Sequence, residues 1–486
     1  MSHAVTLIPG DGVGPEITAA SRRVIEATGV AIEWEEAVAG AAVFERGDTS
    51  GVPQETADSI ARTGVALKGP LATPVGFGEK SANVTLRKLF ETYANIRPAR
   101  QIPGVPTRYD GEGVDFIVVR ENIEDLYAGV EYMDSRDVAV ALKIITRRGS
   151  EKVIRYAFEL ARREGRKKVT CATKANILKL SEGLFKSVFE EMAPEYPDIE
   201  PQHLIIDNVA HQMAKDPAQF DIIVTTNLAG DIISDLASGL VGGLGFAASG
   251  NYGDDAAIFE AVHGSAPKYA GKNVINPTAL ILSSVMMLRH LGEASAAQHI
   301  EDAVFVTLEE GEAVTLDVAR QAGDVEQSTS TSGFADAIIE NLGRAPATTY
   351  ERKSQGPPAT LPEPRPRWEL RTVDGPDTQV IGVDIYTEMD GAPEPIGQAL
   401  EAAAGPEFRL LLVSARGTKV YPTGSSSTDT VGWWRCRFVA AQEGATVTDA
   451  AILALLGRVG ERMPWAHVQK LRMFGEDEGF TRAQGQ

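Results

Sequence analysis

Two aspartates stand four residues apart in the segment NLAGDIISDLASGL, as Asp231 and Asp235. On a helix, side chains with this spacing are neighbours, and two like charges there repel each other. A divalent cation would compensate that repulsion, and carboxylate ligands suit Mg²⁺ or Mn²⁺ better than zinc. Asp207, in HLIIDNVAHQM, is a candidate third ligand. The alternative is structural, with Asp231 capping the helix and Asp235 in solvent.

Arginines form a second group that could do chemistry in this acidic chain. Arg87 and Arg97 lie in SANVTLRKLFETYANIRP, and Arg120 ends the apolar run DFIVVR. Planar guanidinium groups pair bidentately with carboxylates, so several of them together would bind a polyanion. Ser81 and Asn83 add a hydroxyl and an amide to the same segment. For each arginine the alternative is a surface ion pair, and for Ser81 it is a helix N-cap.

Glycines could bring backbone N–H groups close to a ligand in IPGDGVGPEI, residues 8–17. The spacing is GxGxG, however, and not the GxGxxG of dinucleotide-binding Rossmann folds. The segment is therefore either a phosphate cradle or only a tight turn between a strand and a helix. The second set, GLVGGLGF at residues 239–246, leaves the same two interpretations open.

The elements that must position these residues are strands and helices in alternation. From Ala4 to about Gly343, short β-rich runs alternate with amphipathic helical segments, which predicts an α/β layered fold. Examples are AVTLIP before GPEITAASRRVIEAT, and FDIIVTT before DIISDLASGL. An arginine at the end of an apolar strand, such as Arg120, would point toward a sheet edge or a crevice.

The character of the chain changes near Arg344. Residues 344–367 contain six prolines and few large apolar residues, which favours an extended linker over an ordered surface arm. The remaining residues contain three strand-like runs and two helical segments, and they predict a small α+β module. Its tryptophans, Trp433, Trp434 and Trp465, are expected in the core and not around a ligand.

Composition restricts the classes of function. The chain has 486 residues, enough for two or three domains, and 47 basic against 67 acidic residues give a net charge of −20. Such a field repels nucleic acids and anionic membranes. Two cysteines, Cys171 and Cys436, cannot build a disulfide framework or a cysteine-only metal site. With no signal-peptide pattern and no apolar stretch long enough for a membrane span, we expect a cytoplasmic protein.

Taken together and in order, several segments resemble the decarboxylating β-hydroxyacid dehydrogenases, the isocitrate/isopropylmalate dehydrogenase family. These segments are IPGDGVGPEI, KGPLATPVG, SANVTLR, YANIRP, VVRENIEDLYAG, TKANILK, TTNLAGDIISDLASGLVGGLG and EAVHGSAPKYAGKNVINPTA. They cover about the first 340 residues. The C-terminal module resembles the extension found on a long bacterial form of these enzymes.

The resemblance implies an α/β fold that is not a Rossmann fold, in a homodimer or higher homo-oligomer with shared active sites. We expect a discontinuous large domain on the cofactor side at residues 1–93 and 243–345. A small domain with the metal and the dimer interface is expected at 94–242, a linker at 346–367, and the C-terminal α+β module at 368–486.

The resemblance also implies roles for particular residues. Tyr127 would protonate the enol, and Lys174 would come from the neighbouring subunit to handle the hydroxyl proton. Asp231 and Asp235 would ligate Mg²⁺ or Mn²⁺, with Asp207 supplied across the dimer interface. The residues that would bind the substrate's carboxylates are Ser81, Asn83, Arg87, Arg97 and Arg120.

The implied reaction is the oxidative decarboxylation of isocitrate to 2-oxoglutarate, a step of the tricarboxylic acid cycle. Relatives that use isopropylmalate need an apolar surface where isocitrate presents a third carboxylate. Ser81 and Asn83 are hydrogen-bond donors at those positions, which favours isocitrate. An NAD(P)-dependent isopropylmalate or homoisocitrate dehydrogenase is one alternative. The other is a non-catalytic regulatory homologue, but Tyr127, Lys174 and the aspartate pair are intact.

Two basic residues favour NADP as the cofactor. Lys268, followed by Tyr269, stands after the HGSAP turn, where NAD-using relatives usually carry an Asp-Ile-like pair. A lysine attracts the 2′-phosphate, although Lys268 alone could be a surface charge. Arg320 matches a phosphate-binding arginine of NADP-using relatives, but Leu316 stands where some of them have a tyrosine, which weakens the discrimination.

Four further residues are expected near the cofactor. For His263, the alternative is a structural loop histidine whose ring nitrogens bond to neighbouring residues. The four residues are Thr73, His263, Gly264 and Asn276.

Overall fold

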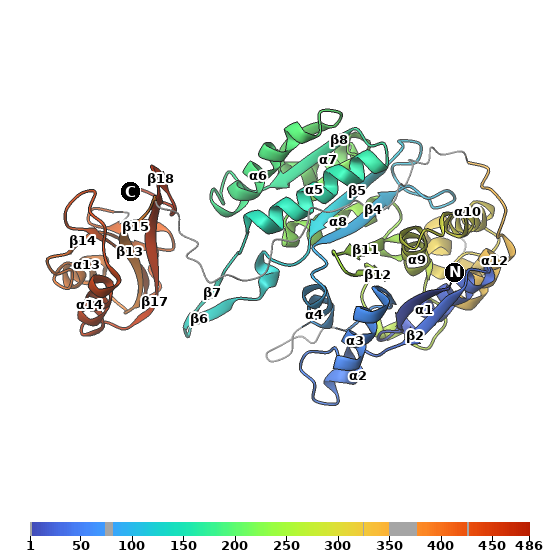
Figure 1. Cartoon of the computed structure of the whole chain (residues 1–486), viewed down its shortest axis with the longest axis horizontal. Helices are drawn as coiled ribbons and strands as arrows, with labels where there is room; N and C mark the ends of the chain where they lie inside the picture. The colour runs from blue at the N-terminus through green and yellow to red at the C-terminus, as the bar shows by residue number, and fades with distance from the viewer. Residues whose placement is uncertain (1, 73–80, 324, 349–376, 425–426) are drawn as a thin grey trace. The chain divides into compact units, whose positions relative to one another are not determined.

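The computed structural model describes residues 2–72, 81–323, 325–348, 377–424 and 427–486 (Figure 1). The chain divides into two compact units, one formed by residues 1–128 and 143–363 and the other by residues 129–142 and 364–486. None of the helices in the described part of the chain has the length and apolarity needed to cross a membrane. Thr73 and most of the predicted linker, from residue 349 on, lie outside the described residues.

A mixed ten-stranded sheet organises the first unit and confirms the predicted α/β class. Its order is β2-β1-β3-β12-β11-β4-β5-β10-β8-β9. Most neighbours are parallel, but β11 runs antiparallel to both β12 and β4, and β4 runs antiparallel to β5. The strands are β1 (His3–Ile8), β2 (Ile32–Glu36), β3 (Val65–Lys68), β4 (Ala94–Arg100), β5 (Asp115–Glu121), β8 (Lys168–Thr173), β9 (Glu200–Ile205), β10 (Ile222–Thr225), β11 (Ala248–Tyr252) and β12 (Ala257–Ala261).

Helices cover both faces of this sheet, which explains the continuous apolar runs in its strands. In β5, Ile117 and Val119 pack in the core under α5 and α6, while Phe116 and Val118 pack in the core under α7 and α8. The helices are α1 (Gly14–Ala27), α2 (Ala41–Phe44), α3 (Gln54–Thr63), α4 (Ala82–Leu89), α5 (Arg147–Arg163), α6 (Ser181–Met192), α7 (Ile206–Lys215), α8 (Asn227–Leu240), α9 (Thr278–His290), α10 (Ala294–Glu310), α11 (Leu316–Ala322) and α12 (Thr331–Glu340).

The glycine-rich segment after β1 is a tight turn packed between two other loops. Gly12 has φ +60°, and a Cβ there would lie 1.9 Å from the carbonyl oxygen of Ser265. The N–H of Asp11 donates to Pro70 and the N–H of Val13 donates to Ser265, at 2.7 and 2.9 Å. These backbone N–H groups already have partners within the protein. The glycines are therefore explained by the tight turn, and a phosphate cradle is not needed to account for them.

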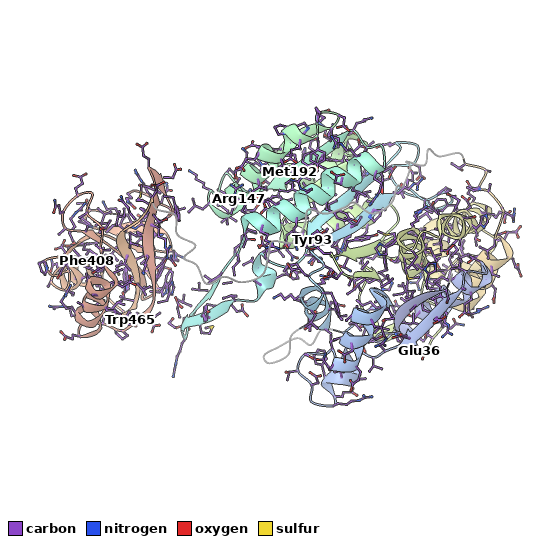
Figure 2. The ribbon with its side chains drawn as sticks, in the orientation of Figure 1. Glu36, Tyr93, Arg147, Met192, Phe408 and Trp465 are labelled. Carbon is purple, nitrogen blue, oxygen red and sulfur yellow. The ribbon has the colours of Figure 1, made fainter. Side chains whose placement is uncertain are left out.

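The second unit combines the C-terminal module with a hairpin from residues 129–142. Its antiparallel sheet has the order β15-β14-β16-β13-β17-β18, with the hairpin β6-β7 as a separate pair. Its core contains Phe408, labelled in Figure 2, and fully buried Trp434. The elements are β6 (Glu131–Ser135), β7 (Val138–Ala141), β13 (Thr378–Glu388), α13 (Pro393–Glu401), β14 (Phe408–Ala415), β15 (Thr418–Tyr421), β16 (Trp433–Ala440), α14 (Asp449–Gly460), β17 (Trp465–Phe474) and β18 (Asp477–Glu478).

The tryptophans of the module do not all lie in its core. Trp434 does, but Trp465 is 41% exposed. Trp433 is half-buried, and its Nε1 donates to Asp134 of the hairpin at 3.0 Å. His467 of β17 pairs with the same carboxylate at 2.9 Å. The prediction of three core tryptophans is thus wrong for Trp465, because it is the first residue of β17 and lies at the strand's end, next to the turn at residues 461–463, and not in its middle.

Candidate functional site

Helix α8 carries the two aspartates of the predicted metal site. It begins after Thr226, so Asp231 lies inside the helix and does not cap it. The side chains of Asp231 and Asp235 are 36% and 55% exposed. Nη1 of Arg97 lies 3.2 Å from Oδ1 of Asp231 and 3.6 Å from Oδ1 of Asp235. Arg97 therefore offsets part of the repulsion between the two carboxylates.

A second arginine and a tyrosine complete the contacts of Asp231. Arg120, at the end of β5, pairs with Oδ1 and also donates from Nη2 to Oδ1 of Asn227 at 2.8 Å. Tyr127 donates from Oη to Oδ2 of Asp231 at 2.5 Å, and the Arg120 guanidinium lies 4.9 Å from the centre of the tyrosine ring. Two of the three predicted arginines, Arg97 and Arg120, thus form one connected group with Tyr127 and Asp231.

Charge and burial oppose each other in this group. Burial alone would raise the pKa of Asp231, but the guanidinium groups of Arg120 and Arg97 outweigh it and lower that pKa. For Asp235, burial dominates and raises the pKa. Burial and the hydrogen bond to Asp231 raise the pKa of Tyr127, so its hydroxyl keeps its proton at neutral pH.

A cavity of about 260 Å³ lies beside this group, large enough for a small organic acid. It brings together three of the five predicted substrate-binding residues, Asn83, Arg87 and Arg97, with His263 and Gly264 from the predicted cofactor loop. Oδ1 of Asn83 and Nε of Arg87 are buried without a hydrogen-bond partner among the described groups. Buried polar atoms of this kind are suited to a polar ligand.

Ser81 lies at the N-cap position of α4, as one of its two interpretations predicted, but its side chain makes no capping hydrogen bond. Its carbonyl oxygen accepts from the N–H of Thr85 at 2.9 Å.

Two residues of the cavity were missed by sequence reasoning, namely Lys68 and Glu260. They are direct neighbours on the parallel strands β3 and β12 and form an ion pair. Glu260 also accepts from Nη2 of Arg87 and Nδ2 of Asn251, both at 2.9 Å. Burial alone would raise the pKa of Glu260, but Lys68 and Arg87 lower it well below its usual value. The available signal was that each is the only charged residue in an otherwise apolar strand.

Glu260→Gln tests how much this network stabilises the fold. Glu260 is 5% exposed, and the amide would leave Lys68 and Arg87 without their carboxylate partner. We expect the free energy of unfolding to fall by about 3–5 kcal/mol, measured by chemical denaturation. As a control, Glu195→Gln removes an exposed partner of Arg155, and a loss below about 1 kcal/mol is expected. Equal losses in the two variants would contradict a special role for the buried network.

The predicted base and the third predicted metal ligand lie next to each other. Nζ of Lys174 is 2.5 Å from Oδ1 of Asp207, and their side chains are 36% and 69% exposed. Within one subunit, the described contacts do not connect this pair to Asp231 or Tyr127. Among the described residues, no set of three or more His, Cys, Asp and Glu side chains is arranged to hold a metal ion.

The predicted cofactor residues lie on two neighbouring segments. Lys268 and Tyr269 are exposed on a short helical turn, Pro267–Tyr269, and Arg320 is exposed on α11. Neither Lys268 nor Arg320 has a carboxylate partner among the described side chains. Asn276 links the segments, because its Nδ2 donates to Asp317 of α11 at 3.0 Å. Leu316 is the first residue of the same helix.

Only one of the two ring nitrogens of His263 has a hydrogen-bond partner in the described part of the chain. Its Nδ1 lies 3.0 Å from the carbonyl oxygen of Gly264, while Nε2 is buried without a partner among the described groups. Burial lowers its pKa, which favours the neutral imidazole. The alternative of a loop histidine satisfied by its neighbours therefore explains only one of the two ring nitrogens.

Comparisons with known proteins match both units. A family described as "Isocitrate/isopropylmalate dehydrogenase" matches residues 4–338, and one described as "Bacterial isocitrate dehydrogenase, C-terminal domain" matches residues 378–486. "Isocitrate dehydrogenase [NADP]" of Thermus thermophilus is 55% identical over 99% of this chain and 96% of its own length. A mitochondrial regulatory subunit of isocitrate dehydrogenase [NAD] from Dictyostelium discoideum is 49% identical over 70% of this chain and 91% of its own length.

Solved structures agree with these matches. A crystal structure of a Thermus thermophilus protein superposes with a TM-score of 0.94 at 55% identity, covering 99% of this chain and 96% of that one. The crystal structure of isocitrate dehydrogenase from Methylococcus capsulatus has a TM-score of 0.67 at 50% identity, covering 70% of this chain and 99% of that one.

Proposed function

Because the chain belongs to the isocitrate/isopropylmalate dehydrogenase family, we propose that it oxidises isocitrate with NADP⁺ and decarboxylates the product to 2-oxoglutarate. The observation that carries this proposal is the position of Arg97. It contacts both Asp231 and Asp235 and also lines the cavity with Arg87 and Asn83. A cavity lined by guanidinium groups, one of which also contacts two neighbouring aspartates, suits a polycarboxylic acid bound together with a divalent cation.

The substrate's three carboxylates would be bound by Arg87, Arg97 and Arg120, with Ser81 and Asn83 as further donors. The unpartnered Nε of Arg87 supports this, because a substrate carboxylate would accept from it, while the unpartnered Oδ1 of Asn83 would accept from the substrate's hydroxyl group. An isopropyl group in their place would leave them unsatisfied. This disfavours isopropylmalate.

The aspartates would hold Mg²⁺ or Mn²⁺. Carboxylate oxygens are the donors that these cations prefer, and the Asp235 side chain is 55% exposed, so an ion can reach it. Asp207 of a second subunit would be the third protein ligand. A divalent cation held there would supply Lewis-acid stabilisation for negative charge that develops on a substrate oxygen.

Two side chains would move protons. Lys174 of the neighbouring subunit would accept the hydroxyl proton as hydride leaves the carbinol carbon. After CO₂ is lost, Tyr127 would return a proton to carbon from Oη, which Asp231 orients by its hydrogen bond. Neutral Tyr127 is the form that can donate.

A homodimer with shared sites would bring Lys174 and Asp207 to Asp231. Exposed apolar side chains support such an interface, because large apolar residues are seldom exposed together on a monomer. Ile177 and Leu180, which follow Lys174, are 65% and 45% exposed, and Ile232, beside Asp231, is 62% exposed. We further propose that the large and small domains have the boundaries expected from the sequence, 1–93 with 243–345 and 94–242.

Lys268 and Arg320 would select NADP by binding its 2′-phosphate. Lys268→Asp combined with Tyr269→Ile should lower the NADP/NAD ratio of kcat/KM about 100-fold, because a favourable charge pair is replaced by repulsion. Lys215→Asp makes the same charge change at the exposed end of α7 and serves as the control. If the ratio moved equally in both variants, Lys268 would not be the selecting residue.

The activity is tested by following NADPH formation with purified full-length protein. We expect turnover with isocitrate and Mg²⁺, loss of turnover in EDTA, and recovery when Mg²⁺ or Mn²⁺ is added in excess. Isopropylmalate should give a kcat/KM lower by roughly 10³-fold or more. A higher kcat/KM with isopropylmalate, or activity unaffected by EDTA, would contradict the proposal.

A further inference from the structure

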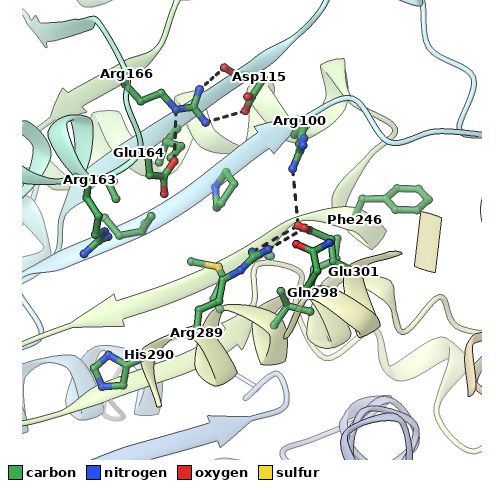
Figure 3. Close-up of a pocket in the computed structure, with 18 of the residues that line it drawn as sticks. Arg100, Asp115, Arg163, Glu164, Arg166, Phe246, Arg289, His290, Gln298 and Glu301 are labelled. Carbon is green, nitrogen blue, oxygen red and sulfur yellow. Dashed lines mark hydrogen bonds and ion pairs between the residues drawn. The ribbon is translucent and has the colours of Figure 1, made fainter. Parts of the chain in front are cut away.

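We propose that a cavity on the opposite face of the ten-stranded sheet binds a small carboxylic acid with an apolar body, and that Arg163 is the partner of its carboxylate. This back cavity has a volume of about 350 Å³, within the range of small-ligand sites. Figure 3 shows its polar lining, with Arg163 and Glu164 on one wall and Arg289 and His290 on the other.

Strand alternation separates the back cavity from the proposed active site. In β4, Arg97 faces the active site, whereas its neighbours Ile96 and Pro98 line the back cavity. In β5, Arg120 contacts Asp231, whereas Ile117 lines the back cavity. Because successive residues of a strand point to opposite faces, a ligand in one site does not touch the other.

Arg163 differs from the other arginines of the back cavity. Arg166 pairs with Asp115 at 2.8 Å, and Arg289 and Arg100 pair with Glu301 at 2.8 and 3.7 Å. Among the described side chains, Arg163 has no carboxylate within ion-pair distance. A guanidinium group that lines a cavity without such a partner is suited to an anionic ligand.

The position of Arg163 at the end of α5 does not by itself explain why an arginine without a carboxylate partner in the described structure lines the cavity. A cation in the last turn of α5 interacts favourably with the helix dipole. Arg162 occupies the same turn, is exposed, and pairs with Asp198 at 2.6 Å. Arg162 thus places a paired cation at this helix end on the surface, while Arg163 lines the cavity.

Neutral polar groups lie close to Arg163. Nδ1 of His290 is buried without a hydrogen-bond partner among the described groups. The ring of Tyr252 lies 5.9 Å from the ring of His290 and 5.5 Å from that of Tyr156, measured between centroids. Burial raises the pKa of Tyr156 to about 12, and the nearby Arg163 opposes that rise. Tyr156 is therefore a hydroxyl donor at neutral pH.

The side chains that line the back cavity carry a net positive charge, which one negative group on a ligand would balance. Four arginines and three carboxylates line the back cavity, and burial lowers the pKa of His290, so the histidine adds no charge. The sum is 4 − 3 = +1. A monocarboxylate would neutralise this excess, whereas a dicarboxylate would leave a buried negative charge without a partner.

Apolar side chains complete the lining and define the rest of the ligand. They come from β4, β5, α5, α9 and α10, so an aliphatic or aromatic body would contact them on several sides. These residues are Ile96, Ile117, Leu160, Leu282, Val285, Met286 and Phe305.

Calorimetric titration of the full-length protein with phenylacetate tests the proposal. The protein is saturated with isocitrate and Mg²⁺, without nucleotide, so that the active site is occupied. We expect one phenylacetate per subunit. Phenylacetamide, which has the same shape without the charge, should bind at least about tenfold more weakly, and so should acetate, which lacks the apolar body.

Two variants and a control locate the binding. Arg163→Gln should weaken phenylacetate binding at least about tenfold, while Arg162→Gln leaves it unchanged. Met286→Trp, which fills the cavity, should abolish binding, and each variant should keep isocitrate turnover within about twofold as evidence of folding. Absence of saturable binding, equal affinity in Arg163→Gln and the unsubstituted protein, or competition by isocitrate would overturn the proposal.

Discussion

Asp231→Asn is expected to lower kcat/KM for isocitrate about 10³-fold, or about 4 kcal/mol of transition-state stabilisation. Asp231 has two tasks in the proposed site, because it would ligate the cation and it accepts the hydrogen bond from Tyr127. The substitution also removes the carboxylate that pairs with Arg97 and Arg120. Steady-state kinetics at increasing Mn²⁺ concentrations should show a weaker apparent affinity for the cation as well.

The control for this variant is Asp198→Asn, which removes an exposed aspartate from a surface ion pair with Arg162. Its kcat/KM should stay within about twofold of the unsubstituted protein. If Asp231→Asn kept kcat/KM within about tenfold and the same Mn²⁺ dependence, Asp231 would not be a metal ligand.

Tyr127→Phe and Lys174→Met should each reduce kcat about 100-fold or more as homodimers, because each removes a proton-transfer group. Their heterodimer, however, should recover about half of the original activity. If Lys174 acts across the interface, one of its two sites combines the intact Tyr127 with the intact Lys174, and the other site lacks both. Purified heterodimers carrying two different affinity tags allow this measurement.

The result separates the two possible arrangements. If Lys174 served the site of its own subunit, both sites of the heterodimer would be defective and activity would stay at the level of the homodimeric variants. Recovered activity therefore supports both the roles of these residues and the shared site. Inactivity of the heterodimer would contradict the arrangement across the interface.

Local patterns were sufficient to predict much of the first unit. The run FDIIVTT followed by DIISDLASGL predicted β10 and α8, and the spacing of Asp231 and Asp235 predicted their proximity on that helix. Arg120 lies at the end of its strand, as expected, and pairs with Asp231. These predictions depended on periodicity and on strand ends, which are local properties.

Other features depend on contacts between distant segments. Lys68 and Glu260 are 192 positions apart in the sequence, and only the pairing of β3 with β12 makes them neighbours. The compensating role of Arg97 between the two aspartates was likewise not predicted, because the pattern on α8 suggested only that some cation was needed.

The C-terminal module was the least predictable part. The run FRLLLVSARGTKVYP forms two strands, β14 and β15, because the chain turns at Arg416 and Gly417, which have φ of 46° and 83°. Strand β17 was missed because polar and apolar residues do not alternate regularly along it, and only one of its residues is buried. The hairpin at residues 129–142 joins this unit through Asp134, a contact that no local pattern indicates.

A crystal structure of the protein with isocitrate and Mg²⁺ tests the central claim most directly. We predict that the carboxylates of isocitrate contact Arg87, Arg97 and Arg120, with one Mg²⁺ bound by Asp231, by Asp235 and by Asp207 of a second subunit. Isocitrate bound away from these guanidinium groups, or electron density without a cation between the aspartates, would contradict the account.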